Sequence, residues 1–503
     1  MELKMGGIES NFAFIDWCIV IVYLLVIVAI GLYLKRYISN VTDFIVAGRG
    51  LRTFLAVATM IGTELGLVTV MYSAQKGFTG GFAAFHIALA SAIVALVVGL
   101  SGFIVVPLRR MKVMTIPEFY ERRFGRGVRI LGGVILALSG ILNMGMFLKA
   151  GSIFVMGITG MTSGLALKII MTALLAMVLL YTSFGGMVSV VVSDYIQFVL
   201  LSFSLLAMCI LSIKHLSWPS IVQTMSLLKG QAGFNPLHSE GFGTSYVVWM
   251  FFLGLVNCAI WQTAVIRACS VESTRIVKRL YIWSSIGFLI RNLLPCFLGV
   301  SALVYIMQNQ SLKNIFLPQG TEADPQLTLM AMPVFLSQIL PVGLLGFVAA
   351  GMLAAFMSTH DSYLLCWSSV LTQDVVAPCF KKGLSSKTRL LLTRIFIVAI
   401  GIFILVWGLW YDLGQDLWDY MAISGAIYFT GAIALLVFGL YWKRASKVGA
   451  YLALICGFGA ILGLKPVQAI LGIELSSAVV GLTVVAGAMA LMLLGSLLFP
   501  ERG

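Results

Sequence analysis

The chain has 503 residues, of which 60% are hydrophobic and only 10% charged, and it carries a formal net charge of +14. Its mean hydropathy is +1.03. Apolar stretches of about 20 residues, the length that crosses a bilayer as a helix, recur along the whole chain. This composition excludes a soluble globular protein. It predicts an all-α polytopic membrane protein with a single membrane domain over residues 1–503.

The basic residues are distributed unevenly along the chain. Lys and Arg cluster in alternate loops, at 35–52, 109–129, 275–279, 381–389 and 443–447. Loops on the cytoplasmic side of a membrane are enriched in these two residues. The excess therefore reflects topology rather than a nucleic-acid-binding surface. It predicts a multi-pass protein of the plasma membrane, which in a bacterium is the cell inner membrane.

Thirteen helices are expected to cross the membrane, which places the N-terminus outside and the C-terminus in the cytoplasm. The first is expected to be retained, because Lys35 and Arg36 follow it rather than a small-residue cleavage site. A short amphipathic helix is expected at 115–124 on the cytoplasmic face. In chain order the expected spans are 12–34, 53–75, 80–107, 127–157, 164–182, 186–212, 245–268, 277–308, 341–372, 386–410, 416–440, 446–463 and 470–498.

Two of these spans contain a weak point. In the second, "GTELG" at 62–66 places two glycines around a carboxylate at mid-depth. Non-helical backbone at that depth is tolerated only where it lines a cavity or is buried in protein. In the seventh, "FLGLVNCAIWQ" contains Gly254 and Asn257. Paired interruptions of this kind point to a binding site, whereas the alternative is that the glycines only allow close helix packing.

Charged side chains inside the expected spans are few. A charge at mid-membrane costs about 2.5 to 3.5 kcal/mol, so such groups usually face the bundle interior or a water-filled cavity. Lys149, Lys168 and Arg394 lie nearer helix ends, where snorkelling to the headgroups accounts for them. The groups expected to lie deeper are Glu64, Asp194, Arg291 and Asp361.

The stretch "AAFMSTHDSYLL" at 354–365 is polar in the middle of an apolar span. At helical spacing Ala355, Ser358, Asp361 and Ser362 share one face, which forms a ladder of oxygens bordered by Thr359. Hydroxyl, carbonyl and carboxylate oxygens are the ligands that small hard cations prefer. The alternative is that the hydroxyls only bond back to their own helix, but the nearby carboxylate favours a cation site.

Four stretches carry a resemblance to a known family. They read "DFIVAGRGL" at 43–51, "TIPEFYERRFG" at 115–125, "YTSFGGMVSVVVSDYIQ" at 181–197 and "MSTHDSYLLCWSSVLTQDV" at 357–375. In order and spacing they resemble motifs of the sodium:solute symporter family, which includes sodium/glucose, proline, pantothenate and sialic acid transporters. The chain is therefore identified as a member of that family.

The resemblance implies a leucine-transporter-type fold, in which two inverted five-helix repeats form the core. The first repeat would cover 53–212 and the second 245–440. The first helix, 12–34, and the C-terminal helices, 446–498, would be peripheral.

The resemblance also implies sodium as the coupling ion and assigns its ligands. The main sodium site would use the carbonyl oxygens of Gly62, Leu65 and Ala355 with the hydroxyls of Ser358 and Thr359. A second cation site, found in some members, would use Asp194, Ser358, Asp361 and Ser362.

By the same resemblance, seven residues would line the substrate pocket: Glu64, Thr69, Phe85, Asn143, Asn257, Arg291 and Tyr428. Arginine offers a planar fork suited to a carboxylate. A pocket with Glu64 on one side and Arg291 on the other would suit an amino acid or other zwitterion, or a small organic anion. The alternative is that these two residues pair with each other and touch no substrate.

The resemblance thus predicts a sodium-coupled symporter, functional as a monomer, that imports a small polar solute by alternating access. A sodium/sugar symporter and a proton-coupled carrier of the same fold remain alternatives. A transporter-like sensor would need a signalling domain that this sequence lacks. A membrane enzyme is disfavoured, because His360 and Asp361 point about 100° apart on a helix and no nucleophile is spaced to join them.

Overall fold

The structure is a computed structural model that describes residues 9–34, 49–161, 163–239, 241–318, 324–380, 383–411 and 414–500. Within these ranges only the backbone is described at 28, 31–32, 34, 181 and 183–193. The described residues form helices joined by short turns, with one isolated bridge between Leu51 and Val271 and no strand. The all-α fold is therefore confirmed.

In chain order, the helices and their bounds are α1 (Phe14–Leu34), α3 (Thr53–Glu64), α4 (Leu67–Gly80), η3 (Gly81–Ala84), α5 (Phe85–Ser101), α6 (Val105–Arg110), α7 (Ile116–Phe124), α8 (Arg126–Met144), α9 (Phe147–Thr159), α10 (Gly164–Leu216), α11 (Trp218–Lys229), η4 (Gly230–Gly233), α12 (Gly243–Ala259), α13 (Gln262–Ser270), α14 (Thr274–Gln308), α15 (Gln310–Phe316), α16 (Pro325–Ile339), α17 (Leu344–Val370), η5 (Leu371–Val376), η6 (Ala377–Cys379), α18 (Ser386–Trp410), α19 (Leu417–Tyr441), α20 (Lys447–Phe458), η7 (Gly459–Gly463), α21 (Lys465–Leu471) and α22 (Ser477–Leu498).

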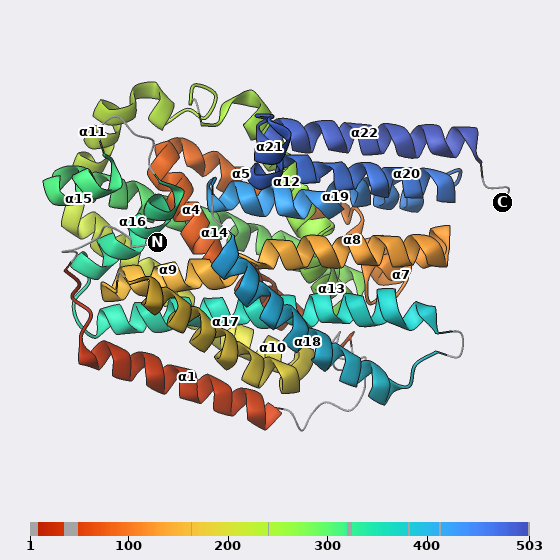
Figure 1. The fold of residues 1–503 in the computed structure, drawn as a ribbon, viewed down its shortest axis with the longest axis horizontal. Coiled ribbons are helices and arrows are strands. Elements are labelled where there is room, and N and C mark those ends of the chain that lie inside the picture. The colour runs from red at the N-terminus through yellow and green to blue at the C-terminus, as the bar shows by residue number, and fades with distance from the viewer. Residues whose placement is uncertain are drawn as a thin grey trace.

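The long helices run roughly along one direction of the molecule (Figure 1). The helices α19, α20 and α22 pack against one another, and α8 contacts both α19 and α17. Two of the connections that carry basic clusters, α7 and the α19–α20 turn, lie at one end of this bundle, on the right of Figure 1. The helices α11 and α15 lie at the other end. The described basic segments in α7 and in the α19–α20 turn thus lie at the same end of the bundle, as the loop pattern predicts.

By length and composition, eight of the described helices can cross a membrane, or ten if each of two bent pairs is one span. Three further apolar helices are shorter. The expected number of thirteen spans therefore stays a prediction. Most of the expected spans nevertheless coincide with helices. The short helix expected at 115–124 is present as α7, whose first turn is capped by the Thr115 side chain.

The two spans expected at 164–182 and 186–212 form one helical run, α10, of 53 residues. A straight helix of that length would measure about 80 Å, far more than a bilayer needs. The neighbouring helices α9 and α11 lie at the same end of the bundle in Figure 1, so α10 crosses the molecule and returns. The helical backbone continues through the glycine pair at 185–186, where the sequence predicts a gap between spans.

The second expected span is broken where its glycines predict. Helix α3 ends at Glu64, Leu65 has φ −94° and ψ 63°, and α4 begins after the extended residue Gly66. A Cβ atom on Gly66 would lie 2.0 Å from the Thr359 hydroxyl oxygen. Only glycine therefore allows α17 to approach the break this closely.

The seventh expected span is broken as well. Helix α12 ends at Ala259 and α13 begins at Gln262, and the two are bent by 41°. The break falls shortly after the weak point at Gly254 and Asn257. Both interruptions expected from the sequence are thus confirmed as features of the backbone.

Candidate functional site

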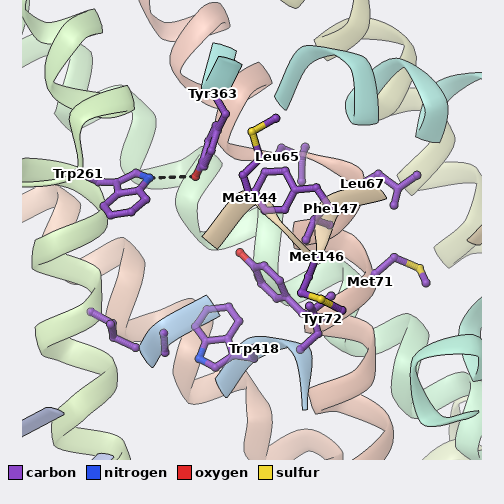
Figure 2. Close-up of a cluster of buried hydrophobic side chains, with 14 of the residues drawn as sticks. Leu65, Leu67, Met71, Tyr72, Met144, Met146, Phe147, Trp261, Tyr363 and Trp418 are labelled. Atoms are coloured by element: carbon purple, nitrogen blue, oxygen red, sulfur yellow. Dashed lines mark hydrogen bonds between the residues drawn. The ribbon is translucent and has the colours of Figure 1, made fainter. Parts of the chain in front are cut away.

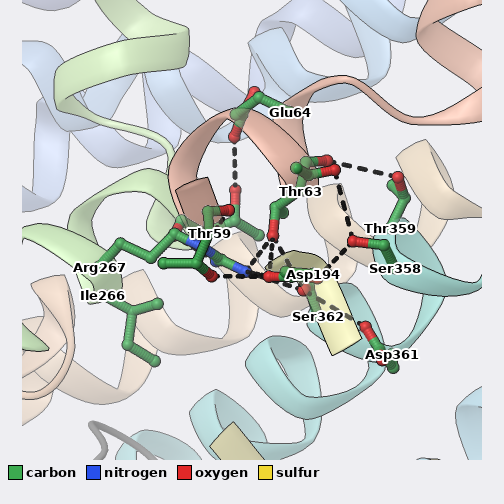
Figure 3. Close-up of polar contacts among 12 residues, drawn as sticks. Thr59, Thr63, Glu64, Asp194, Ile266, Arg267, Ser358, Thr359, Asp361 and Ser362 are labelled. Carbon is green, nitrogen blue, oxygen red and sulfur yellow. Dashed lines mark hydrogen bonds and ion pairs between the residues drawn. The ribbon is translucent and has the colours of Figure 1, made fainter. Parts of the chain in front are cut away.

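The polar face of α17 lies against the end of α3, just before the break (Figure 3). The Ser358 hydroxyl donates to the Gly62 carbonyl over 3.3 Å. The Thr359 hydroxyl donates to the carbonyls of Ala355, over 3.0 Å, and of Thr63, over 3.3 Å. The fold therefore gathers four of the five residues expected at the main sodium site, and Leu65 stands at the adjacent break.

Asp194 on α10 lies behind this group and is fully buried. Its Oδ1 accepts a hydrogen bond from the Ser358 hydroxyl. Its Oδ2 accepts from the hydroxyls of Thr59, over 2.6 Å, and Thr63, over 3.0 Å. Ser358 thus links the oxygens expected to bind sodium to a buried carboxylate, as its place in both expected cation sites requires.

A buried arginine that sequence reasoning missed joins the same cluster. Arg267 on α13 is only 1% exposed. Its Nη2 donates to the hydroxyls of Thr63 and Ser362 and lies 3.4 Å from the Asp194 Oδ2. Because Arg267 stands one residue before the end of the expected span 245–268, the sequence favours a helix-end residue there. The structure instead places its guanidinium in the middle of the bundle.

The remaining members of the expected second cation site lie one turn further along α17. The Ser362 hydroxyl is 3.4 Å from the Asp361 Oδ1 and 3.2 Å from the Thr63 hydroxyl. Asp361 is fully buried. The expected set therefore converges on one place, but the guanidinium of Arg267 lies within it.

A central cavity of about 60 Å³ lies beside the α3–α4 break. Its wall contains five of the seven residues expected to contact substrate: Glu64, Thr69, Asn143, Asn257 and Arg291. Much of the rest of the wall is aromatic: Tyr72, Phe147, Trp261, Tyr363, Trp418 and Phe429. The first five are labelled in Figure 2. The rings of Tyr72 and Trp418 meet edge to face at 4.5 Å, and the Trp261 indole donates to the Tyr363 hydroxyl over 3.0 Å.

The two charged residues of this cavity pair with each other. The Arg291 Nη1 donates to the Glu64 Oε2 over 2.6 Å and to the Glu64 carbonyl over 3.2 Å. The other carboxylate oxygen of Glu64 accepts from the Thr263 hydroxyl over 3.3 Å. The pair joins α14 to the broken helix. It also belongs to the cavity wall, so pairing does not remove these residues from reach of a solute.

Phe85 and Tyr428 lie outside the lining of this cavity. Phe85 begins α5 and packs against Phe82 with ring centroids 5.4 Å apart. The Tyr428 hydroxyl is fully buried and shares a 2.9 Å hydrogen bond with the Tyr120 hydroxyl of α7. In this structure Tyr428 therefore joins α19 to α7.

An ion-pair cluster that the sequence did not reveal joins α4 to α19, toward the end of the bundle away from the basic loops. The Lys76 ammonium lies 2.9 Å from Asp416 and 2.8 Å from Asp419. The Tyr246 hydroxyl of α12 donates to Asp419 over 3.1 Å. Lys76 stands one residue beyond the expected span 53–75, in the short stretch between two expected spans.

The profile of the sodium:solute symporter family matches residues 44–457, most of the chain. The chain belongs to the sodium:solute symporter family. This confirms the resemblance carried by the four motifs, and it makes the protein a membrane transporter with sodium as its coupling ion.

Relatives of this symporter transport different solutes. It is 24% identical to the sodium/glucose cotransporter of Vibrio parahaemolyticus, over 92% of this chain and 87% of that protein. It is also 24% identical to the sodium/proline symporter 2 of Staphylococcus saprophyticus, over 93% and 91% of the two chains. Among solved structures, a substrate-bound, outward-open Na⁺-coupled sialic acid symporter superimposes with a TM-score of 0.81 at 20% sequence identity. The match covers 98% of this chain and 100% of that one. The fold is thus confirmed.

The residues of the symporter at the α3–α17 contact fit a sodium ion. They present carbonyl and hydroxyl oxygens, which hard cations prefer over sulfur or imidazole. Within the described parts of the chain, no three His, Cys, Asp or Glu side chains group together as a transition-metal site would require. The donor set therefore suits the coupling ion of the family.

Proposed function

We propose that this symporter imports a small zwitterion such as an amino acid, or a small organic anion, together with sodium. The observation that carries this proposal is the Glu64–Arg291 pair in the cavity wall, with 2.6 Å between Oε2 and Nη1. A bound zwitterion would replace this one ion pair by two: its carboxylate would pair with Arg291 and its ammonium with Glu64. Charge-assisted bonds of this kind are the strong ones in a low-dielectric site.

The start of α4 supports the same class of solute. Val68 and Thr69, in the first turn of α4, line the cavity. The first backbone N–H groups of a helix have no partner within it and favour a negative group. Half-helix starts in broken transporter helices serve anionic substrate groups in this way. The cavity volume of about 60 Å³ favours a compact solute.

A sodium/sugar symporter is the second candidate. The sodium/glucose cotransporter of Vibrio parahaemolyticus matches nearly as much of this chain as the sodium/proline symporter 2 does, 92% against 93%, at the same identity of 24%. Asn143 and Asn257 line the cavity and offer the amide groups that a sugar hydroxyl would use. The two classes differ in whether the solute needs the charges of Glu64 and Arg291.

For sodium we propose the main site at Gly62, Leu65, Ala355, Ser358 and Thr359. Sodium there would bridge the broken helix and α17. The substrate cavity adjoins this site, because Thr63, the residue after Gly62 on α3, lines the cavity. Binding of either ligand would then favour binding of the other by the same factor. The bound charge lets a membrane potential contribute about 2.3 kcal/mol per 100 mV. Alternating access would follow from one helix bundle rocking against the other.

We further propose that the basic end of the bundle faces the cytoplasm, with the N-terminus outside, and that one chain is the functional unit. The concentration of Lys and Arg at this end supports the orientation. In a bacterium the location would be the cell inner membrane.

Thermal unfolding of the detergent-purified protein tests the substrate class, because a ligand that binds only the native state raises its apparent stability. Amino acids, small carboxylates and sugars would each be added in sodium and in potassium. Stabilisation by amino acids or carboxylates, only in sodium, is the expected result. Stabilisation by sugars alone would select the second candidate. Stabilisation of the same size in sodium and in potassium would instead favour a proton-coupled carrier.

A further inference from the structure

A groove of about 680 Å³ lies on the outside of the bundle, between α3, α10 and α14. Leu65 and Leu205 belong to its wall and are buried, whereas Phe54, Trp283 and Ile286 also line it and are more than half exposed. None of its lining residues lines the central cavity. The parts of α10 and α14 that form it belong to helices apolar and long enough to cross a membrane. The groove therefore opens toward lipid and lies apart from the transport path.

Aromatic side chains mark one end of this groove. The rings of Phe54 on α3 and Tyr195 on α10 meet edge to face at 5.9 Å, and Trp283 on α14 is 57% exposed. Trp and Tyr are enriched where a membrane meets water. The starts of α3 and α14 lie side by side here, because Leu51 and Val271 form a bridge just before them. The groove thus runs from the interface into the membrane.

Basic side chains lie at the same end. Arg279 stands one turn before Trp283 on α14, and positions 279, 283, 286 and 290 share one helix face. Trp283, Ile286 and Ile290 on this face line the groove. Arg279 is exposed and has no acidic partner among the residues that the structure describes. The face of α14 that lines the groove therefore ends in an exposed, unpaired positive charge.

A second arginine precedes the other wall of the groove. Arg52 directly precedes α3, and its only ion pair within the described ranges is with Glu272, over 3.4 Å with both side chains exposed. Such a pair contributes little. The neighbouring Arg49 donates to the Lys112 carbonyl, just before α7, so this end of the groove lies at the same end of the bundle as α7. Two guanidinium groups are thus available to one headgroup.

The groove and the arginines together define a ligand. Lipid tails are as apolar as leucine, so an apolar groove alone does not select one lipid from the others. Basic side chains at the membrane surface attract anionic headgroups. We infer that the groove binds one anionic phospholipid, with an acyl chain between α3, α10 and α14 and its phosphate at Arg52 and Arg279.

The bound acyl chain would support the first half of the broken helix. Ile61 and Leu65 of α3 line the groove, next to the Gly62 carbonyl. On α14, a Cβ atom at Gly287 would lie 2.5 Å from the Ile61 side chain, so the two helices already touch there. The acyl chain fills the space beside this contact and holds α3 against α10 and α14. Lipid binding should therefore stabilise the folded protein.

Native mass spectrometry of the purified full-length protein in detergent tests the headgroup. The probes are dioleoyl phosphatidylglycerol and dioleoyl phosphatidylcholine, which have the same acyl chains. The wild type is expected to retain one phosphatidylglycerol, with a preference of about fivefold for each arginine. Arg52→Gln, Arg279→Gln should lose this preference, and Lys443→Gln, Arg444→Gln, with the same charge change in the α19–α20 turn, should keep it. Equal retention of both lipids by the wild type, or a preference that survives in the Arg52, Arg279 variant, would overturn the inference.

Filling the groove tests the acyl-chain part. Ser202→Trp adds an indole to the groove wall with both arginines intact, and should release the lipid, whereas Ile455→Trp on the exposed face of α20 should not. Retention of phosphatidylglycerol by Ser202→Trp would overturn the site. A wild-type dimer in the same spectra, lost in Ser202→Trp, would do so as well, because a second copy of the chain would then occupy the groove.

Thermal unfolding in nanodiscs keeps the test decisive if Ser202→Trp does not fold. Adding phosphatidylglycerol to phosphatidylcholine nanodiscs should raise the unfolding temperature of the wild type and of the Lys443, Arg444 variant. It should leave that of the Arg52, Arg279 variant unchanged. A rise of equal size in all three proteins would place the action of the lipid elsewhere and contradict the inference.

Discussion

The hydroxyl of Ser358 on α17 donates a 3.3 Å hydrogen bond to the carbonyl of Gly62 on α3, 296 residues earlier in the chain. Gly62 lies in the last turn before the break in its helix, where carbonyl oxygens lose their intrahelical partners. The Ser358 hydroxyl of α17 therefore supplies a hydrogen-bond donor to a carbonyl at the helix break. The same contact explains why two glycines and a Ser-Thr pair occur at mid-membrane in helices that are otherwise apolar.

Removing the hydroxyl of Ser358 or that of its neighbour Thr359 should weaken sodium binding. We expect Ser358→Ala and Thr359→Ala each to raise the sodium concentration for half-maximal stabilisation or transport about tenfold, which corresponds to roughly 1.4 kcal/mol for one lost polar contact. His360→Ala is the matched control, because the His360 ring packs against Phe356 and Phe147, away from these oxygens. Equal, small effects of all three substitutions on sodium dependence would contradict the main-site assignment.

Arg291→Lys should weaken substrate binding without removing sodium binding. The Arg291 Nη1 serves both the carbonyl and the carboxylate of Glu64. A substrate carboxylate would accept two parallel bonds from the planar guanidinium, which a lysine ammonium, a point charge, cannot offer. We expect substrate affinity to fall about tenfold, a loss of roughly 1.4 kcal/mol, while sodium still stabilises the protein. Unchanged affinity for every stabilising solute would remove Arg291 from the substrate site.

Gly66→Ala should distort the sodium site through sterics alone. Its Cβ would lie 2.0 Å from the Thr359 hydroxyl oxygen, so the hydroxyl or the helix break has to move. We expect weaker sodium binding and lower thermal stability. Gly459→Ala is the control, because its Cβ would meet no atom closer than 4.0 Å. Sodium titrations of both variants decide the matter, and a Gly66→Ala protein that titrates like wild type would show that the α3–α17 contact is dispensable.

Lys76→Met should destabilise the protein by leaving two carboxylates without their cation. The Lys76 side chain is 5% exposed, whereas Asp416 and Asp419 are 21% and 23% exposed. Breaking a fully buried pair costs about 3 to 5 kcal/mol, and partial exposure reduces this to roughly 1 to 3 kcal/mol. Thermal unfolding would detect the loss, with the exposed Lys443→Met as control. The prediction is wrong if the two variants unfold at the same temperature.

Substrate transport by Lys76→Met separates stability from function. The cluster joins α4, α12 and α19 at the end of the bundle opposite the basic loops. If the cluster serves only stability, the transport rate per folded molecule, measured well below the unfolding temperature, should equal that of the wild type.

The parts of the site that depend on local chemistry could be predicted from the sequence. The break at Gly62–Gly66 follows from glycine in a helix, and the oxygen face of α17 follows from the spacing of Ser358 and Ser362. The family motifs supplied the pairing of these two helices. Five cavity residues were anticipated by the same resemblance, whereas Phe85 and Tyr428 lie outside the lining of the cavity.

Residues near the ends of expected spans were the ones that the sequence could not place. Arg267 and Lys76 each stand within one residue of such an end, where a charge ordinarily reaches water or headgroups. The turn at the α12–α13 break and the packing of α4 against α19 bury both side chains instead. Nothing in the local pattern distinguishes a buried end from an exposed one.

By itself the sequence determined that this chain spans a membrane, which loops carry its basic charge, where two helices are broken and which helix face is rich in oxygen. All of these depend on residues within a few turns of one another. Only the tertiary structure decided which polar groups share a site, because Asp194, Arg267 and Ser362 come from three different helices. Their partners depend on how those helices pack, and in a bundle of apolar helices that packing is set by many small contacts rather than by any short stretch of sequence.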